Sequence, residues 1–216
     1  MFAFGPVPSR RLGQSLGINN IPPKICTYSC VYCQLGRTIK MQKKRDEFYE
    51  PKMLIQNIKT RVRELKEKRE PVDYLTFVPD GEPTLDVNLG EEIKILKPVD
   101  VKTAVITNAS LIWDADVKTS LLEADWVSLK VDAVSREIWK TINRPHGALS
   151  LESILNGMTK FSADFNGILA TETMLVQGVN DKKDEIEKIA EHLSCISPDI
   201  SYISIPTTRP AEEWAN

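Results

Sequence analysis

The stretch CTYSCVYC, residues 26–33, places Cys26, Cys30 and Cys33 within eight residues of a 216-residue chain that has four cysteines in all. The fourth, Cys195, lies far downstream. Whatever the three clustered thiols bind therefore has to accept an incomplete set of protein ligands from this segment.

The composition is that of an ordinary soluble domain. The chain is 42% hydrophobic and 27% charged, and its length allows one substantial core, so residues 1–216 are expected to form a single domain. No apolar run is long enough for a membrane helix, and Gly5 and Pro6 interrupt the opening MFAF before it could serve as a signal-peptide core. We therefore expect a cytoplasmic protein with reduced thiols, in a compartment where clustered cysteines bind metal.

Positive charge is concentrated around the cysteines. Residues 1–45 contain eight Lys or Arg and no Asp or Glu, while the remaining 171 residues hold 20 basic and all 30 acidic side chains. Such a segment stabilises thiolates and attracts an anionic substrate or partner. A solvated basic loop over residues 40–45 explains the same pattern, so the charge by itself does not show nucleic-acid binding.

Strand-like and helix-like stretches alternate after the cysteine segment. Strands are predicted over residues 15–21, 72–78, 101–107, 126–131, 169–176 and 201–205. Amphipathic helices are predicted over residues 88–96, 116–123, 151–161 and 184–195, and another has an apolar face of Leu54, Ile55, Ile58, Val62 and Leu65. This alternation indicates right-handed crossovers and a parallel α/β sheet, and six strands suffice for most of a barrel.

Polar segments follow the predicted strands. They are PDGEPT, TNAS, SLKVDA, QGVND and PTTRP, beginning at residues 79, 107, 128, 177 and 206. Ligands of parallel sheets bind beyond the carboxyl ends of the strands, so these segments are candidate binding loops. Gly, Pro, Asn and Asp also make ordinary turns, which is the competing interpretation at each strand.

Three thiolates on one short loop can hold three irons of a cubane cluster and leave the fourth iron without a protein ligand. Zinc is the main alternative, because a structural zinc site closes four ligands, usually as two Cys pairs or as Cys with His. Here Cys195, His146 or His192 could complete a zinc site only through a long-range contact. An ordinary electron-carrying ferredoxin would use Cys at all four irons, which this segment does not offer.

The spacing Cys-x3-Cys-x2-Cys, with Tyr32 before the last cysteine, resembles the signature of the radical S-adenosylmethionine (SAM) superfamily. The surrounding GPVPSRRLGQSLGINNIPPKICTYSCVYCQLGRT, residues 5–38, resembles the branch related to the wyosine-base synthases of transfer RNA. The resemblance covers essentially the whole chain, through TTRPAEEW at residues 207–214.

This resemblance implies a partial (βα)6 TIM-like barrel, a parallel sheet open on one side, in which Cys26, Cys30 and Cys33 hold a 4Fe-4S cluster. The open iron would be chelated by SAM, and one electron from the cluster would give methionine and a 5′-deoxyadenosyl radical that abstracts hydrogen from a substrate. It also implies a low-potential electron donor of the flavodoxin or ferredoxin type.

The resemblance further implies a set of SAM contacts. The candidates are Tyr32, Gly81, Glu82, Asn108, Ser128, Lys130 and Asp132. Gly81 and Glu82 match the family's Gly-Gly-Glu motif, which holds the methionine amino group, although Asp80 replaces the first glycine. Ser128, Lys130 and Asp132 alternate and so face one way in a strand. Lys130 could equally be an ordinary strand-end charge. Tyr32 is expected to cover the cluster and SAM together with Tyr28.

The expected substrate is a macromolecule, RNA or protein. Arg10, Arg11, Arg144 and His146 are candidates to face it. Wyosine-base synthesis in the family uses a second cluster held by three more cysteines, and this sequence has one left, Cys195. That counts against the same reaction and leaves a related RNA modification that needs one cluster. We expect Cys195 in the hydrophobic core. The alternatives are a protein-modifying radical SAM activase and a non-catalytic metal or iron–sulfur binding module. An open barrel edge after residue 205 would call for a partner or a further carboxyl-terminal segment.

Overall fold

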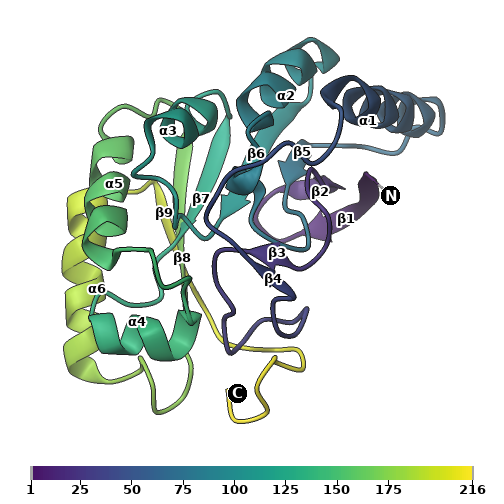
Figure 1. Ribbon diagram of the computed structural model, residues 1–216. Coiled ribbons are helices and arrows are strands. Elements are labelled where there is room, and N and C mark those ends of the chain that lie inside the picture. The colour runs from purple at the N-terminus through teal and green to yellow at the C-terminus, as the bar shows by residue number, and fades with distance from the viewer. Residues whose placement is uncertain (1, 216) are drawn as a thin grey trace.

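The computed structural model describes residues 2–215 (Figure 1). A curled seven-stranded sheet has the order β1-β2-β5-β6-β7-β8-β9. Its strands are β1 (Ala3–Ser9), β2 (Gly13–Ile18), β5 (Tyr74–Phe77), β6 (Lys102–Thr107), β7 (Trp126–Lys130), β8 (Ile168–Met174) and β9 (Ile200–Ser204). Every neighbouring pair from β2 to β9 is parallel, so the predicted open α/β barrel is confirmed.

Helices connect the parallel strands and lie along the outside of the curled sheet (Figure 1). They are α1 (Pro51–Glu67), α2 (Leu89–Leu96), α3 (Ala115–Leu121), α4 (Arg136–Asn143), α5 (Leu151–Ser162) and α6 (Lys183–Ile196), with short 3-10 turns η1 (Pro83–Leu85) and η2 (Lys97–Val99). The buried residues of α1 are the five of its predicted apolar face. The periodicity of the sequence therefore located this helix and its packing side.

Among the strands of the seven-stranded sheet and the α-helices, β1 and α4 were not predicted from the sequence. β1 contains Gly5 and two prolines, which argue against a strand, but it is an antiparallel edge strand where missing ladder hydrogen bonds are tolerated. α4 buries Trp139, Ile142 and Asn143 on one side, so a polar residue belongs to its packed face and weakens the amphipathic pattern. Neither element alters the parallel frame, but α4 contributes to the site described below.

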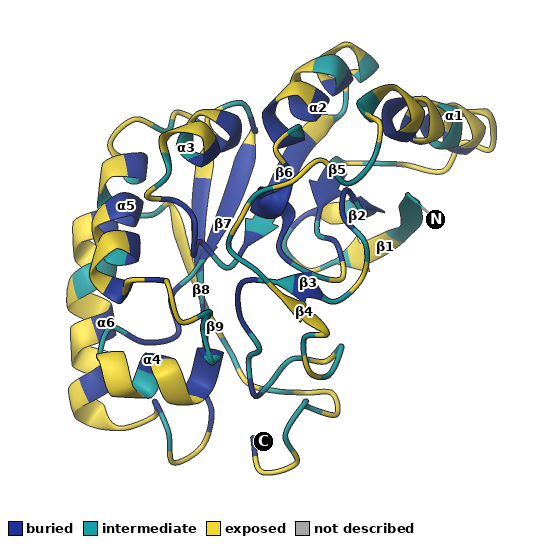
Figure 2. Cartoon of the chain, in the orientation of Figure 1, coloured by how far each residue is buried: buried dark blue, intermediate teal, exposed yellow. Residues whose placement is uncertain are grey.

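The central strands β5, β6 and β7 are mainly buried (Figure 2), and the two faces of the sheet contribute to different clusters. Side chains on the helix-covered face, such as Leu75 and Val127, join the main core. The inner face has a small separate cluster of Leu12, Ala104, Trp126 and Ala170. Because side chains alternate along a strand, the rest of the inner face remains for polar groups.

Residues between β2 and α1 form a long loop with a two-stranded ribbon of β3 (Ile25–Cys26) and β4 (Lys40–Met41). Backbone bonds anchor this loop: Glu82 N–H donates to Ile25 O over 3.1 Å, and Val31 N–H donates to Ile142 O over 2.9 Å. Glu212 N–H of the carboxyl-terminal segment donates to Val31 O over 2.9 Å. The cysteine segment is thus fixed by three distant parts of the chain.

None of the helices described in residues 2–215 is both long enough and apolar enough to span a bilayer.

Candidate functional site

The three clustered cysteines lie on the anchored loop. Cys26 ends β3, Cys30 and Cys33 follow it, and all three are half-buried. Burial raises the pKa of Cys26 far above its ordinary value and that of Cys30 to about 12, so these two thiols are protonated at neutral pH. A metal that binds such thiols supplies the positive charge for deprotonation and releases protons as it binds.

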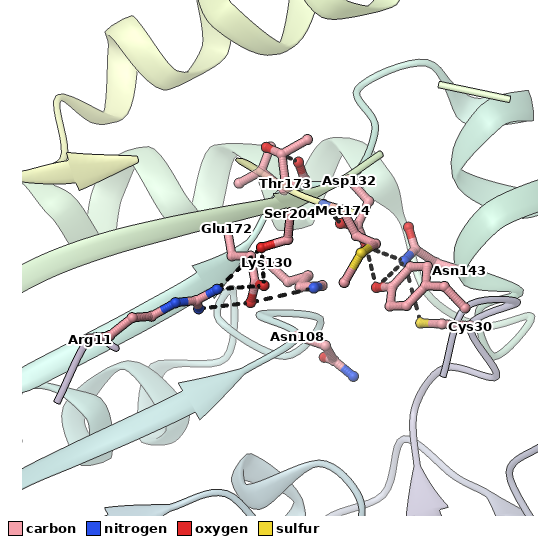
Figure 3. Close-up of polar contacts among 12 residues, drawn as sticks. Arg11, Cys30, Asn108, Lys130, Asp132, Asn143, Glu172, Thr173, Met174 and Ser204 are labelled. Carbon is pink, nitrogen blue, oxygen red and sulfur yellow. Dashed lines mark hydrogen bonds and ion pairs between the residues drawn. The ribbon is translucent and has the colours of Figure 1, made fainter. Parts of the chain in front are cut away.

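Two side-chain amides reach the sulfurs from different elements. Asn108, directly after β6, donates from Nδ2 to Cys26 Sγ over 3.5 Å. Asn143, the last residue of α4, donates from Nδ2 to Cys30 Sγ over 3.4 Å (Figure 3). Hydrogen bonds of this kind favour thiolate over thiol and tune the potential of a cluster.

No three or more His, Cys, Asp and Glu side chains within residues 2–215 are placed to hold a metal ion. A single zinc ion needs ligands that converge on it at roughly 2.0–2.3 Å. A cubane instead meets three thiolates at three different irons, so this geometric result concerns single-ion sites.

Asn108 also orders the loop itself. Its Nδ2 donates to Thr27 Oγ1 over 2.8 Å, and Ser110 Oγ donates to the same oxygen over 2.7 Å. Thr27 is fully buried. The end of β6 therefore holds the residue directly after Cys26, a role for Thr27 that sequence reasoning missed because Thr in a cysteine loop carries no signal of its own.

Gly81 and Glu82 lie beneath the ribbon. A Cβ on Gly81 would lie only 2.1 Å from Ile25 O, so the close approach of β3 requires glycine. Glu82 is 1% exposed, and its Oε1 accepts from Thr84 N, Thr84 Oγ1 and Thr107 Oγ1 at 3.1, 2.6 and 2.6 Å. Within residues 2–215, its Oε2 accepts a single hydrogen bond, from Asn108 N–H over 2.8 Å, which leaves acceptor capacity on that oxygen.

Burial raises the pKa of Glu82, whereas its hydrogen bonds to Thr107 and Thr84 act in the opposite direction. A cation that donates to Oε2 would further favour the carboxylate.

Asp132 connects the cysteine loop to the sheet (Figure 3). Tyr32 O–H donates to its Oδ2, and Asn143 Nδ2 donates to the same oxygen over 2.7 Å. Met174 N–H, at the end of β8, donates to Oδ1 over 2.8 Å. The carboxylate thus fixes the ring of Tyr32, whose pKa is raised by burial and then by the nearby Asp132 charge.

Lys130, the last residue of β7, points into a charged group on the inner face (Figure 3). Its Nζ lies 3.5 Å from Glu172 Oε2 and 4.9 Å from the ring centroid of Tyr32. Arg11 grips Glu172 with two bonds, from NH2 to Oε1 at 2.7 Å and from NH1 to Oε2 at 3.0 Å. Burial would raise the pKa of Glu172, but the Arg11 bonds and the Lys130 charge outweigh it and lower the value to about 2.

The structure also places the other candidate residues. Ser128 lies in β7 and is buried, two residues before Lys130. Arg144 NH1 pairs with Glu212 Oε1 over 2.5 Å, at the anchored end of the loop. His146 N–H donates to Thr27 O over 2.8 Å, so its backbone supports the loop. Arg10 is exposed on the turn before β2.

The expectation for Cys195 was wrong. It is exposed on α6 and lines a groove with His192, between α5 and α6, instead of packing in the core. Cys195 was expected in the core because it lies close to Leu193 and Ile196 in the sequence, but of these three residues only Ile196 is buried. One turn of helix contains both faces, so proximity to apolar residues in sequence did not decide exposure.

Together these residues fit a cluster and SAM. Three half-buried thiols receive amide donors, and nearby groups include a carboxylate oxygen with spare acceptor capacity on Glu82, an ammonium on Lys130 and a carboxylate on Asp132. The groups come from the carboxyl ends of β5, β6, β7 and α4, the side of the sheet where ligands bind.

Comparisons with known proteins place the chain. Residues 20–193 match the family model described as "Radical SAM superfamily". The chain is 49% identical over 212 residues to the UPF0026 protein MJ1312 of Methanocaldococcus jannaschii, covering 98% of itself and 65% of that protein. It is 36% identical over 211 residues to the UPF0026 protein of Helicobacter pylori strain J99, covering 95% of itself and 67% of that protein.

Solved structures share the fold at low identity. One is "Structure of TYW1 with a lysine-pyruvate adduct bound", with a TM-score of 0.65, 22% identity and coverage of 87% of this chain and 64% of that one. Another is Streptococcus suis SuiB bound to precursor peptide SuiA, with a TM-score of 0.64, 13% identity and coverage of 87% and 38%. The chain therefore belongs to the radical SAM superfamily and, within it, to the UPF0026 family.

Proposed function

We propose that Cys26, Cys30 and Cys33 hold a 4Fe-4S cluster that cleaves SAM reductively to act on a macromolecular substrate. The observation that carries this proposal is the anchored loop with three half-buried thiols, two of them contacted by Asn108 and Asn143. When bound, the reduced cluster and SAM supply a 5′-deoxyadenosyl radical that abstracts hydrogen from the substrate.

The protein's own residues would bind and orient the two cofactors. Glu82 Oε2, which accepts one hydrogen bond at present, is the proposed acceptor for the amino group of SAM. Lys130 is the proposed partner of its carboxylate. Asn108, Ser128 and Asp132 are proposed to contact the ribose side, and Gly81 allows the close approach of β3 that brings Cys26 to this place.

Tyr32 is proposed to cover the cluster loop. Its hydroxyl is fixed by Asp132 and its ring lies against Lys130. A ring held on both sides excludes water from the groups beneath it, which protects a reactive radical from side reactions. Tyr28 is also buried and fills the space behind the loop, where its hydroxyl oxygen accepts a hydrogen bond from Trp139 Nε1–H over 3.1 Å.

The proposed low-potential donor, of the flavodoxin or ferredoxin type, docks on the β3–β4 ribbon. Met41 pairs with Cys26 in the ribbon, so a single strand separates a proposed cluster ligand from the surface. Met41 and Ile39 are 38% and 80% exposed, and the exposed Lys40 and Lys44 flank them. An apolar centre with a cationic rim suits an acidic protein partner.

RNA is the proposed substrate class, supported by the basic character of residues 1–45. Protein is the alternative substrate class, and it is supported by the similar fold of Streptococcus suis SuiB, which was solved with a precursor peptide bound. The edge at β9, where Ile203 is 75% exposed and Ile205 is 64% exposed, is proposed to be covered by a partner or by further chain. This chain spans 65% of the length of the Methanocaldococcus jannaschii relative. The activity and the substrate class are therefore both proposals for this protein.

The test begins with purification without oxygen and reconstitution with iron and sulfide. SAM and a strong reductant are then added, and 5′-deoxyadenosine is quantified for the unsubstituted protein, Cys30→Ala and the matched control Cys195→Ala, whose cysteine lies on α6 away from the loop. We expect product from the first and third and none from Cys30→Ala. A loaded cluster whose EPR spectrum ignores SAM would instead identify a non-catalytic iron–sulfur module.

A further inference from the structure

A pocket of about 530 Å3 opens between the β1–β2 turn and the β8–β9 edge. Its lining includes Arg10, Arg11, Glu172, Tyr202, Ser204 and Thr207. The volume lies within the roughly 300–1,000 Å3 of small-molecule sites. The proposed cluster and SAM contacts use none of the residues in this lining.

The pocket carries more positive than negative charge. Arg11 and Lys130 share one carboxylate, Glu172, and their side chains are 21%, 16% and 13% exposed respectively. Arg10 adds a second guanidinium to the lining and has no ion-pair partner among residues 2–215. If the SAM carboxylate neutralises Lys130, two arginines still face a single carboxylate. An anion in the pocket would balance the remaining positive charge.

Arg11 is already held in place for recognition. Besides its two bonds to Glu172, NH2 donates to Ser204 Oγ over 3.3 Å. Its guanidinium carbon lies 4.4 Å from the ring centroid of Tyr202. A guanidinium fixed on three sides loses little conformational entropy when it binds an oxyanion, and Arg10 beside it supplies unused donors.

The pocket adjoins the proposed cofactor site. Glu172 lines the pocket and also contacts Lys130 (Figure 3). The Lys130 ammonium lies over the ring of Tyr32. Tyr32 in turn stands between Cys30 and Cys33 in the sequence of the loop. A ligand held by Arg10 and Arg11 would therefore lie next to the place where SAM is proposed to bind. That position suits the substrate.

We propose that Arg10 and Arg11 bind an oxyanion of the substrate, a carboxylate or a phosphate, in this pocket. The designation of the ligand as substrate rests on the proposed function, whereas anion binding does not. Glu172 sets the strength of binding, because its charge competes with the ligand for Arg11.

The test titrates inorganic phosphate, and separately acetate, into the reconstituted protein without SAM or reductant, with binding measured by calorimetry. The variants are Arg10→Ala, Arg10→Glu and Glu172→Gln, and the matched control is Arg63→Ala, an exposed arginine on α1. Removing one charged donor is expected to weaken phosphate binding about tenfold in Arg10→Ala, with a larger loss in Arg10→Glu. Glu172→Gln is expected to strengthen it, and Arg63→Ala to leave it unchanged.

The outcomes separate the hypotheses. Binding of phosphate without acetate points to a phosphorylated substrate. Binding of both anions shows that the pocket also accepts a carboxylate. Equal affinity in Arg10→Ala and Arg63→Ala, or no binding of either anion, would overturn the pocket assignment. If Glu172→Gln does not fold, the charge reversal at Arg10 still gives the decisive comparison. If the unsubstituted protein forms no 5′-deoxyadenosine but still binds anions, the proposed function is overturned and the assignment of the pocket as an anion site stands.

Discussion

Gly81→Ala is expected to damage both stability and cluster loading through one backbone contact. The added Cβ would lie 2.1 Å from Ile25 O and 2.9 Å from Ile21 Cδ1, and the first of these is a backbone atom that cannot turn aside. Relief requires β3 to move, which also strains the 3.1 Å bond from Glu82 N–H to Ile25 O. Cys26 is the next residue, so the displacement reaches a proposed iron ligand.

The magnitude follows from these two effects. Overpacking of a tight contact costs about 1–3 kcal/mol, and a lost hydrogen bond adds about 1 kcal/mol, which together give a loss of about 2–4 kcal/mol. Alanine restricts the unfolded chain and offsets this loss by about 0.4–1 kcal/mol, so the unfolding free energy should fall by about 1–3.6 kcal/mol. For a chain of this size, at about 2–4 °C per kcal/mol, that corresponds to a Tm lower by roughly 2–14 °C.

The assay is thermal unfolding of the cluster-free protein followed by circular dichroism, with iron per chain measured after reconstitution. Gly147→Ala is the matched control, because a Cβ there meets nothing within 4 Å. We expect Gly147→Ala to unfold at or slightly above the unsubstituted protein. A Gly81→Ala protein with the same Tm and iron content as Gly147→Ala would refute the argument that the close approach of β3 requires glycine.

Three further predictions concern charge. The pKa of Glu172 in the fold, about 2, lies below its ordinary 4.5, so its contribution to stability is present above about pH 4.5 and is lost as the pH falls toward 2; acid unfolding of cluster-free protein should be less steep in Glu172→Gln. Glu92 is fully buried, and neither of its carboxyl oxygens has a hydrogen-bond partner in the described part of the chain; burial followed by the Asp86 charge raises its pKa to about 9. Its folded form therefore retains a proton that the unfolded chain loses, which reduces stability as the pH rises from about 4.5 to 9, and Glu92→Leu should raise the unfolding free energy at pH 8 by about 2 kcal/mol in denaturant titrations. Lys40→Glu with Lys44→Glu should slow cluster reduction by flavodoxin in a salt-dependent manner and leave reduction by dithionite unchanged in stopped-flow absorbance, whereas an equal effect on both reductants would exclude this docking surface.

The sequence by itself predicted the parallel, partly closed barrel and the place of the cysteine loop. Both depend on local patterns. Residues 54–65 repeat their apolar positions at the helical period, and the spacing of Cys26, Cys30 and Cys33 is contained within eight residues. The rule that ligands bind at the carboxyl ends of parallel strands made the segments after β5 and β6 candidate binding loops. The resemblance to the superfamily then singled out Glu82 and Asn108, which the structure brings together through the Asn108 N–H bond.

Only the tertiary structure decided which distant side chains meet. Arg11 and Glu172 are separated by 161 residues, and no local pattern encodes that curling of the sheet brings the β1–β2 turn against β8. Asn143 reaches Cys30 because the short helix α4 ends beside the loop. Cys195 is exposed because it lies off the face of α6 that buries Glu185, Ile189 and Ile196. Local periodicity is fixed by backbone geometry within a few residues, whereas these contacts depend on how complete elements pack, and that is determined by the whole chain.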